Sequence, residues 1–183
     1  MTLNDIIVST LAQLDRGHDS QTIETWRGKL TGFANEAMLD LATMLQLRRT
    51  DTVTLANGIL DTLTLPETCV KVLSVLKGGA TLPVYPGPTS TQLRVTAPDG
   101  TVDVHYRYLP KDMENPTDVP DLPSFCHSLI TTYVVARERA AQDPSMQRGA
   151  SIYFELYNAG KRSLREAIGL GVGGRTQQII NRW

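Results

Sequence analysis

The sequence has 183 residues, enough for one ordinary domain with a sizeable apolar core. Its 18 basic and 19 acidic side chains give a formal net charge of -1, so charge favours neither nucleic acid nor an anionic membrane as a partner. No stretch reaches the roughly 18 apolar residues of a membrane-spanning helix. The first residues also lack the features of a secretory signal, so we expect a protein made in the cytoplasm.

The beginning of the chain predicts a short amphipathic helix. Apolar residues recur at every third or fourth position over residues 3–15, as they do on the buried face of a helix. Thr2 followed by Asp5 resembles a capping box with a shortened acid. The turn-forming residues 16–20 then end this helix.

A second and longer helix is expected over residues 22–47, with Ser20 or Thr22 as its N-cap. Gly28 and Gly32 lie inside this helix, where a glycine costs about 1 kcal/mol relative to alanine. Two interpretations stay open for them. Either another backbone passes close to the helix at this point, or they are loose surface glycines.

The hydrophobic period changes to two over residues 51–109, which predicts an inserted antiparallel β region. Turn formers divide this region at Asn57-Gly58, at Gly78-Gly79 and at Ala97-Pro98-Asp99-Gly100. Residues 82–88 contain three prolines, which exclude a central strand and favour a stiff, exposed segment. We expect that segment to project from the body.

The last third of the chain predicts two more helices. Residues 110–123 hold four prolines among acidic residues and are expected to form a solvated connection. Helices are then expected over 124–142 and 145–168, followed by a separate, glycine-hinged tail over 169–183. The resulting prediction is a single domain over residues 1–168. It is mainly α, a four-helix bundle with an inserted small antiparallel β region (α+β) and a C-terminal tail extension.

The sequence offers little catalytic chemistry. His18, His105 and His127 have no second ligand at a recognisable metal spacing. Cys69 and Cys126 are expected to be two buried free thiols. Cys126 and His127 are adjacent and diverge on a helix, so they cannot pair as nucleophile and base. His105 could still meet Cys126 through folding, which keeps a cryptic hydrolase as a remote alternative. We expect no enzyme, no metal and no cofactor.

Hydrophobic anchors and turn residues follow one another in a definite order along the chain. These are Trp26, Leu30, Phe33-Ala34-Asn35-Glu36-Ala37, Leu55, Gly58, Leu63-Thr64-Leu65-Pro66, Tyr106, Leu109-Pro110, Asp118-Val119-Pro120-Asp121-Leu122-Pro123, Tyr133-Val134-Val135-Ala136-Arg137, Asp143, Ala150, Tyr153-Phe154 and Tyr157. Over nearly the whole chain this order resembles the phage adaptor proteins of the head-to-tail connector. They are also called head completion or gatekeeper proteins and lie under the portal in podophages and related viruses.

The resemblance implies a structural adaptor of the virion neck, made in the host bacterial cytoplasm. Copies would form a ring, twelve to match the portal, that docks under the portal protein and extends the DNA channel. The ring would also hold a downstream tail or nozzle protein, and genomic DNA would pass through without sequence-specific binding or any membrane contact. A ring needs two different complementary faces on each subunit. The second face of the long helix and the proline-rich segment are candidates for them.

The resemblance also assigns site residues. It assigns portal binding to residues of the C-terminal tail, which are Leu170, Val172, Arg175, Ile179, Ile180, Arg182 and Trp183. Contact with the tail components falls to Pro83, Tyr85 and Pro86. The channel lining falls to Asp112, Glu114 and Asp118.

Two alternatives to these expectations stay open. Trp183 could fold back onto its own bundle instead of reaching the portal. The whole chain could instead be a small helical binding or regulatory module, working alone or as a dimer.

Overall fold

The computed structural model describes residues 1–142 and 147–168. The described residues form two compact units, one made of Met1–Ala37 with the described residues from 123 onward and the other of Met38–Leu122. Helix accounts for about 47% of the structure and strand for about 26%, so this is a mixed α+β fold. The predicted mainly α four-helix bundle is therefore wrong. The β region of the protein is larger than the predicted small insertion, because strands of up to ten residues form two sheets around a core of their own.

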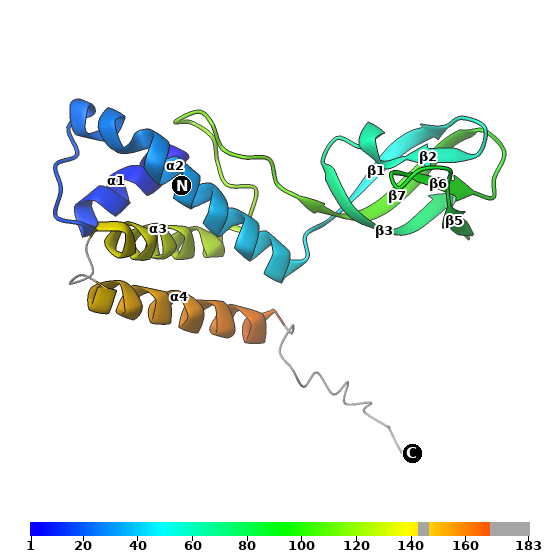
Figure 1. The fold of residues 1–183 in the computed structure, drawn as a ribbon. Coiled ribbons are helices and arrows are strands. Elements are labelled where there is room, and N and C mark those ends of the chain that lie inside the picture. The colour runs from blue at the N-terminus through cyan, green and yellow to red at the C-terminus, as the bar shows by residue number, and fades with distance from the viewer. Residues whose placement is uncertain (143–146, 169–183) are drawn as a thin grey trace, which may run out of the picture. The chain divides into compact units, whose positions relative to one another are not determined.

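Four α-helices lie in the described part of the chain (Figure 1). They are α1 (Leu3–Gln13), α2 (Ser20–Leu45), α3 (His127–Gln142) and α4 (Gln147–Ala167), with a 3-10 turn, η2 (Ser124–Cys126), before α3. Helix α2 begins in the first unit, and its residues from Met38 onward belong to the second. None of these helices combines the length and apolar character needed to cross a membrane.

The start of α1 confirms the predicted capping box. The Thr2 hydroxyl accepts a hydrogen bond from the Asp5 amide at 3.2 Å, and the Asp5 carboxylate accepts one from the Thr2 amide at 2.8 Å. The bond from the Thr2 amide favours the ionised carboxylate and is the main cause of the lowered pKa of Asp5, which the nearby Thr2 side chain lowers further.

The start of α2 differs from the prediction. The Asp19 carboxylate accepts hydrogen bonds from the amides of Gln21 and Thr22, both at 3.1 Å, and the Asp19 carbonyl accepts the Ile23 amide. Asp19 is therefore the N-cap, and the assignment of that role to Ser20 or Thr22 is wrong. An aspartate, a serine and a threonine all make good caps, and the sequence places all three within one helical turn.

Seven strands form two antiparallel sheets in the second unit. The larger sheet has the order β1-β7-β3-β4 and the smaller has the order β2-β6-β5. Their bounds are β1 (Arg48–Leu55), β2 (Ile59–Asp61), β3 (Thr68–Lys77), β4 (Ala80–Leu82), β5 (Val84–Pro86), β6 (Gln92–Val95) and β7 (Gly100–Leu109), with a 3-10 turn, η1 (Thr62–Thr64), after β2. Both sheets supply side chains to one apolar core, in which Tyr106 is the largest fully buried residue.

Two of the three predicted turns are confirmed by the backbone. Asn57 and Gly58 have φ angles of 56° and 66°, and Gly78 and Gly79 have φ angles of 57° and 84°. Two successive residues with positive φ make the tight turns whose twist suits antiparallel strands, so these pairs connect β1 to β2 and β3 to β4.

Candidate functional site

Helix α2 packs against α3 in the first unit through charged side chains. The Glu36 carboxylate accepts hydrogen bonds from the Tyr133 hydroxyl at 3.2 Å and from Arg137 Nε at 3.0 Å. Further back along α2, Lys29 Nζ lies 2.6 Å from Glu138 Oε2. Because lower numbers in α2 meet higher numbers in α3, the two helices are antiparallel.

Helix α4 packs against α3 through aromatic side chains. The Tyr133 ring lies 6.0 Å from the ring of Phe154 and 5.0 Å from that of Tyr157. Gly160 fits directly against Leu129, where an added Cβ would collide with the leucine side chain. Helix α4 is thus antiparallel to α3 as well. It follows that α2 and α4 point in the same sense, with α2 inclined to α4, as Figure 1 shows.

The face of α4 away from these aromatic contacts is apolar and exposed. Ile152 is 59% exposed and Leu156 is 56% exposed, although both are large aliphatic residues on a folded helix. With Ala159, they border a shallow groove of about 500 Å³ that is flanked by Glu155 and Arg162. We call this line the α4 strip, formed by Ile152, Leu156, Ala159 and Ser163, all exposed. Exposed apolar patches of this kind mark protein interaction sites.

Helix α2 also has an exposed line, but with small side chains. We call it the α2 strip, formed by Gln21, Thr25, Gly28 and Gly32, all exposed. A Cβ added at either glycine would meet no described atom within 4 Å. Within the described part of this chain, therefore, no other backbone passes close to the glycines.

A buried carboxylate joins the loop after α1 to α3. Glu138 is fully buried, with Arg16 Nη2 at 3.3 Å and Lys29 Nζ at 2.6 Å. The Arg16 guanidinium also lies over the Trp26 ring, 3.6 Å from its centroid. Two cations around one buried anion offset its desolvation, so this cluster orients α2 on α3.

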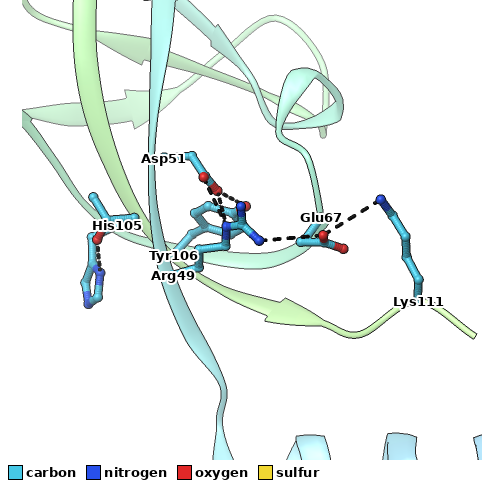
Figure 2. A network of polar contacts seen from close by, with 7 residues as sticks. Arg49, Asp51, Glu67, His105, Tyr106 and Lys111 are labelled. Carbon is cyan, nitrogen blue, oxygen red and sulfur yellow. Dashed lines mark hydrogen bonds and ion pairs between the residues drawn. The ribbon is translucent and has the colours of Figure 1, made fainter. Parts of the chain in front are cut away.

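The second unit holds a polar network between β1 and β7 (Figure 2). The Tyr106 hydroxyl donates to Asp51 Oδ2 at 2.6 Å, and Arg49 Nε donates to Asp51 Oδ1 at 3.0 Å. Burial raises the pKa of Tyr106, and the hydrogen bond to Asp51 raises it further. On the same strand pair, Thr50 Oγ1 lies 3.0 Å from His105 Nδ1.

This network continues to the segment after β7. Arg49 Nη1 lies 3.7 Å from Glu67 Oε1, and Lys111 Nζ lies 3.8 Å from the same oxygen (Figure 2). Burial, followed by the nearby Asp121 carboxylate, raises the pKa of Tyr108 to about 12. These contacts link the acidic connection to the sheet, although exposed ion pairs of this length add little stability.

The three acidic residues assigned to the channel, Asp112, Glu114 and Asp118, differ from one another in exposure and in hydrogen bonding. Asp118 accepts hydrogen bonds from the amides of Glu114 and Asn115, both at 2.8 Å, so it closes a local turn, and these bonds lower its pKa. Asp112 and Glu114 are exposed. Asp112 lies beside Asp118 at the rim of a hollow of about 390 Å³. Whether the three face a DNA channel stays a prediction.

The residues assigned to the tail components lie at the margin of the small sheet. Tyr85 and Pro86 belong to the edge strand β5, Pro83 directly precedes it, and all three are exposed. Next to them is a cleft of about 430 Å³ beside β3, lined by residues 69–74 and by Val84 of β5. Strand β3 pairs with β4 only through residues 75–77, so the cleft lies along the part of β3 that β4 leaves uncovered.

The cysteines and histidines do not favour the cryptic hydrolase. Cys126 is fully buried and burial raises its pKa to about 11, whereas a nucleophilic cysteine needs a lowered pKa and access to solvent. Cys69 is half-buried rather than buried as predicted, and burial raises its pKa too. Over residues 1–142 and 147–168, no three His, Cys, Asp or Glu side chains lie close enough to hold a metal ion.

The residues assigned to portal binding lie outside the described residues, as does Asp143. They are Leu170, Val172, Arg175, Ile179, Ile180, Arg182 and Trp183. Comparison with known proteins adds no relative, because the chain matches neither a known protein family nor a curated protein.

Ile152 and Leu156 were not among the site residues predicted from the sequence. The signal was present, because they stand four residues apart and are turned by about 100–140° around the helix from Tyr157. A helix with apolar residues on two sides indicates two partners, and among residues 1–142 and 147–168 only one of them is present, α3.

Proposed function

We propose that this chain is a structural subunit of the connector that joins the head of a tailed bacteriophage to its tail. Copies form a ring under the portal, extend the DNA channel and provide the platform for tail attachment. The observation that carries this proposal is the α4 strip. Two large aliphatic side chains, each more than half exposed on a folded helix, call for a protein partner rather than for a small substrate.

The resemblance of the chain to phage adaptor proteins indicates which kind of assembly this partner belongs to, namely a ring of copies. A ring subunit needs two unlike faces, and the first unit offers an apolar α4 strip and a small-residue α2 strip on helices that both pack on α3. The exposed Tyr85 and the prolines around it offer a stiff surface to a tail or nozzle protein.

The proposal includes the partners that the resemblance implies. Twelve copies bind the portal protein through the C-terminal residues from Leu170 to Trp183. Pro83, Tyr85 and Pro86 face the tail components. Genomic DNA passes through the ring without sequence-specific contacts, and the protein acts in the neck of the virion.

The test uses the full-length chain and the purified portal protein of the same phage. Mass measurement of the mixture is expected to show a portal that has gained a complete ring of this chain. A variant lacking residues 175–183 is expected to keep its circular dichroism spectrum and to lose portal binding. A full-length chain that stays monomeric and unbound beside the portal would refute the proposal.

A further inference from the structure

We infer that neighbouring copies in the ring contact each other through the α4 strip of one copy and the α2 strip of the next. This inference rests on the proposed function and names the two faces that the ring uses. A ring requires a head-to-tail interface, in which two different surfaces of the subunit are complementary.

The two strips have a compatible direction. Within one copy, α2 and α4 run the same way because each is antiparallel to α3. Neighbours in a ring of many copies differ by only a small rotation, so helix directions are nearly preserved from copy to copy. Helix α4 of one copy therefore meets α2 of the next with both helices pointing in the same sense.

The spacing of the two strips also matches. Each strip steps by four, three and four residues, which is the pattern of the inward positions of a coiled coil. Aligned in parallel, Leu156 faces Thr25 and Ala159 faces Gly28. The glycine has open space before it, so α4 can approach closely and bury Leu156 without a clash.

The charges beside the strips select this parallel alignment. Glu155 and Arg162 flank the α4 strip seven residues apart, and Lys29 and Glu36 flank the α2 strip seven residues apart. In parallel coiled coils the flanking positions of opposite sides meet, which brings Glu155 to Lys29 and Arg162 to Glu36. Both pairs are of opposite charge. Reversing one helix would bring neither Lys29 nor Glu36 to that flank.

The charged side chains of Lys29 and Glu36, which flank the α2 strip, are still accessible to a partner. The Lys29 side chain is 41% exposed while it holds Glu138, and the Glu36 side chain is 47% exposed while it holds Arg137. A neighbouring copy would extend each ion pair into a short network of alternating charges, which fixes register more than it adds affinity.

A disulfide experiment tests the alignment. In a Cys69→Ser background, the double variant Ala159→Cys with Gly28→Cys is assembled on the portal and oxidised. We expect a ladder of covalent multimers on a non-reducing gel. The matched control replaces Gly28→Cys with Gln21→Cys, which is exposed on the same strip about 10 Å further along the helix. The control is expected to give no ladder.

A substitution tests the strip independently of cysteine chemistry. Leu156→Glu is expected to weaken ring formation at least tenfold while the circular dichroism spectrum is kept, because the side chain is exposed in the free subunit. Leu63→Glu, at a leucine that is 76% exposed in the other unit, is the control and is expected to assemble normally.

The outcomes separate the two proposals. If the parent chain forms rings on the portal, while the disulfide ladder is absent and Leu156→Glu assembles like the parent, the inference is wrong and the proposed function stands. If the parent chain forms no ring at all, both fall. Two results together support the ring interface and the proposed function. The ladder must require Ala159→Cys paired with Gly28→Cys, and Leu156→Glu must assemble poorly.

Discussion

Removing one hydroxyl from the β unit should reveal how strongly its core depends on a single polar contact. Tyr106→Phe keeps the buried ring and deletes only the donor to Asp51, a bond of 2.6 Å. Hydrogen bonds to ionised groups contribute about 1.5–3 kcal/mol. Asp51 keeps its bond to Arg49 at 3.0 Å, so the free energy of unfolding at pH 7.5 should fall by about 2 kcal/mol.

The same substitution should change the response to alkaline pH. The pKa of Tyr106 is raised in the folded chain, above the value of about 10 expected for an unfolded tyrosine. The neutral phenol therefore contributes stability that is fully present below pH 10 and is lost as pH rises toward the folded pKa. Over that window the loss is about 1.4 kcal/mol per pH unit for each such tyrosine. Tyr108, with a pKa of about 12, adds a loss of the same sign.

Urea unfolding at pH 7.5 and pH 11 measures both effects, with amide hydrogen exchange in β7 reporting on the second unit. Tyr106→Phe should be less stable at pH 7.5 and should lose less stability on going to pH 11. Tyr85→Phe is the control, because that hydroxyl is exposed and its removal should cost less than about 0.5 kcal/mol. A Tyr106→Phe protein with the stability and pH slope of the parent would refute the reasoning.

Three further predictions concern the helical unit. Gly160→Ala should change the free energy of unfolding in urea by less than about 1 kcal/mol, because the end of the flexible Leu129 side chain can shift away from the new methyl group and alanine is the better helix former; a loss above about 2 kcal/mol would contradict this. Glu138→Gln should cost about 1–2 kcal/mol, because it removes the anion that two partly exposed cations contact, so a Tm equal to that of the parent would argue against the cluster. Cys126 should react with Ellman's reagent at pH 8 only after unfolding, and reaction in the native state faster than that of Cys69 would contradict its burial.

Local chemistry was the part of the fold that the sequence could predict. The capping box of Thr2 and Asp5 and the turn at Asn57-Gly58 each depend on residues within one or two turns of chain, and both are present. The N-cap of α2 shows the limit of such reasoning. Asp19 and Ser20 are equally good caps, and only the entry direction of the chain decides between them.

Long-range pairing was the part that the sequence could not predict. Asp51 and Tyr106 are 55 positions apart, and nothing near either residue indicates that β1 lies beside β7. The fold class failed for the same reason. A period of two marks strands, but it does not say that two sheets will share a core large enough to make a unit of its own.

The division of the chain has a consequence for how a newly made copy folds. Residues 38–122 are continuous and hold one unit, whereas the other unit is interrupted by them. During synthesis at roughly 5–20 residues per second, α1 and the start of α2 would wait about 4 to 17 seconds for α3 to emerge from the ribosome. The β unit has all its strands by then, so it should fold first, while Leu3, Ile6 and Ile7 remain uncovered and attractive to chaperones.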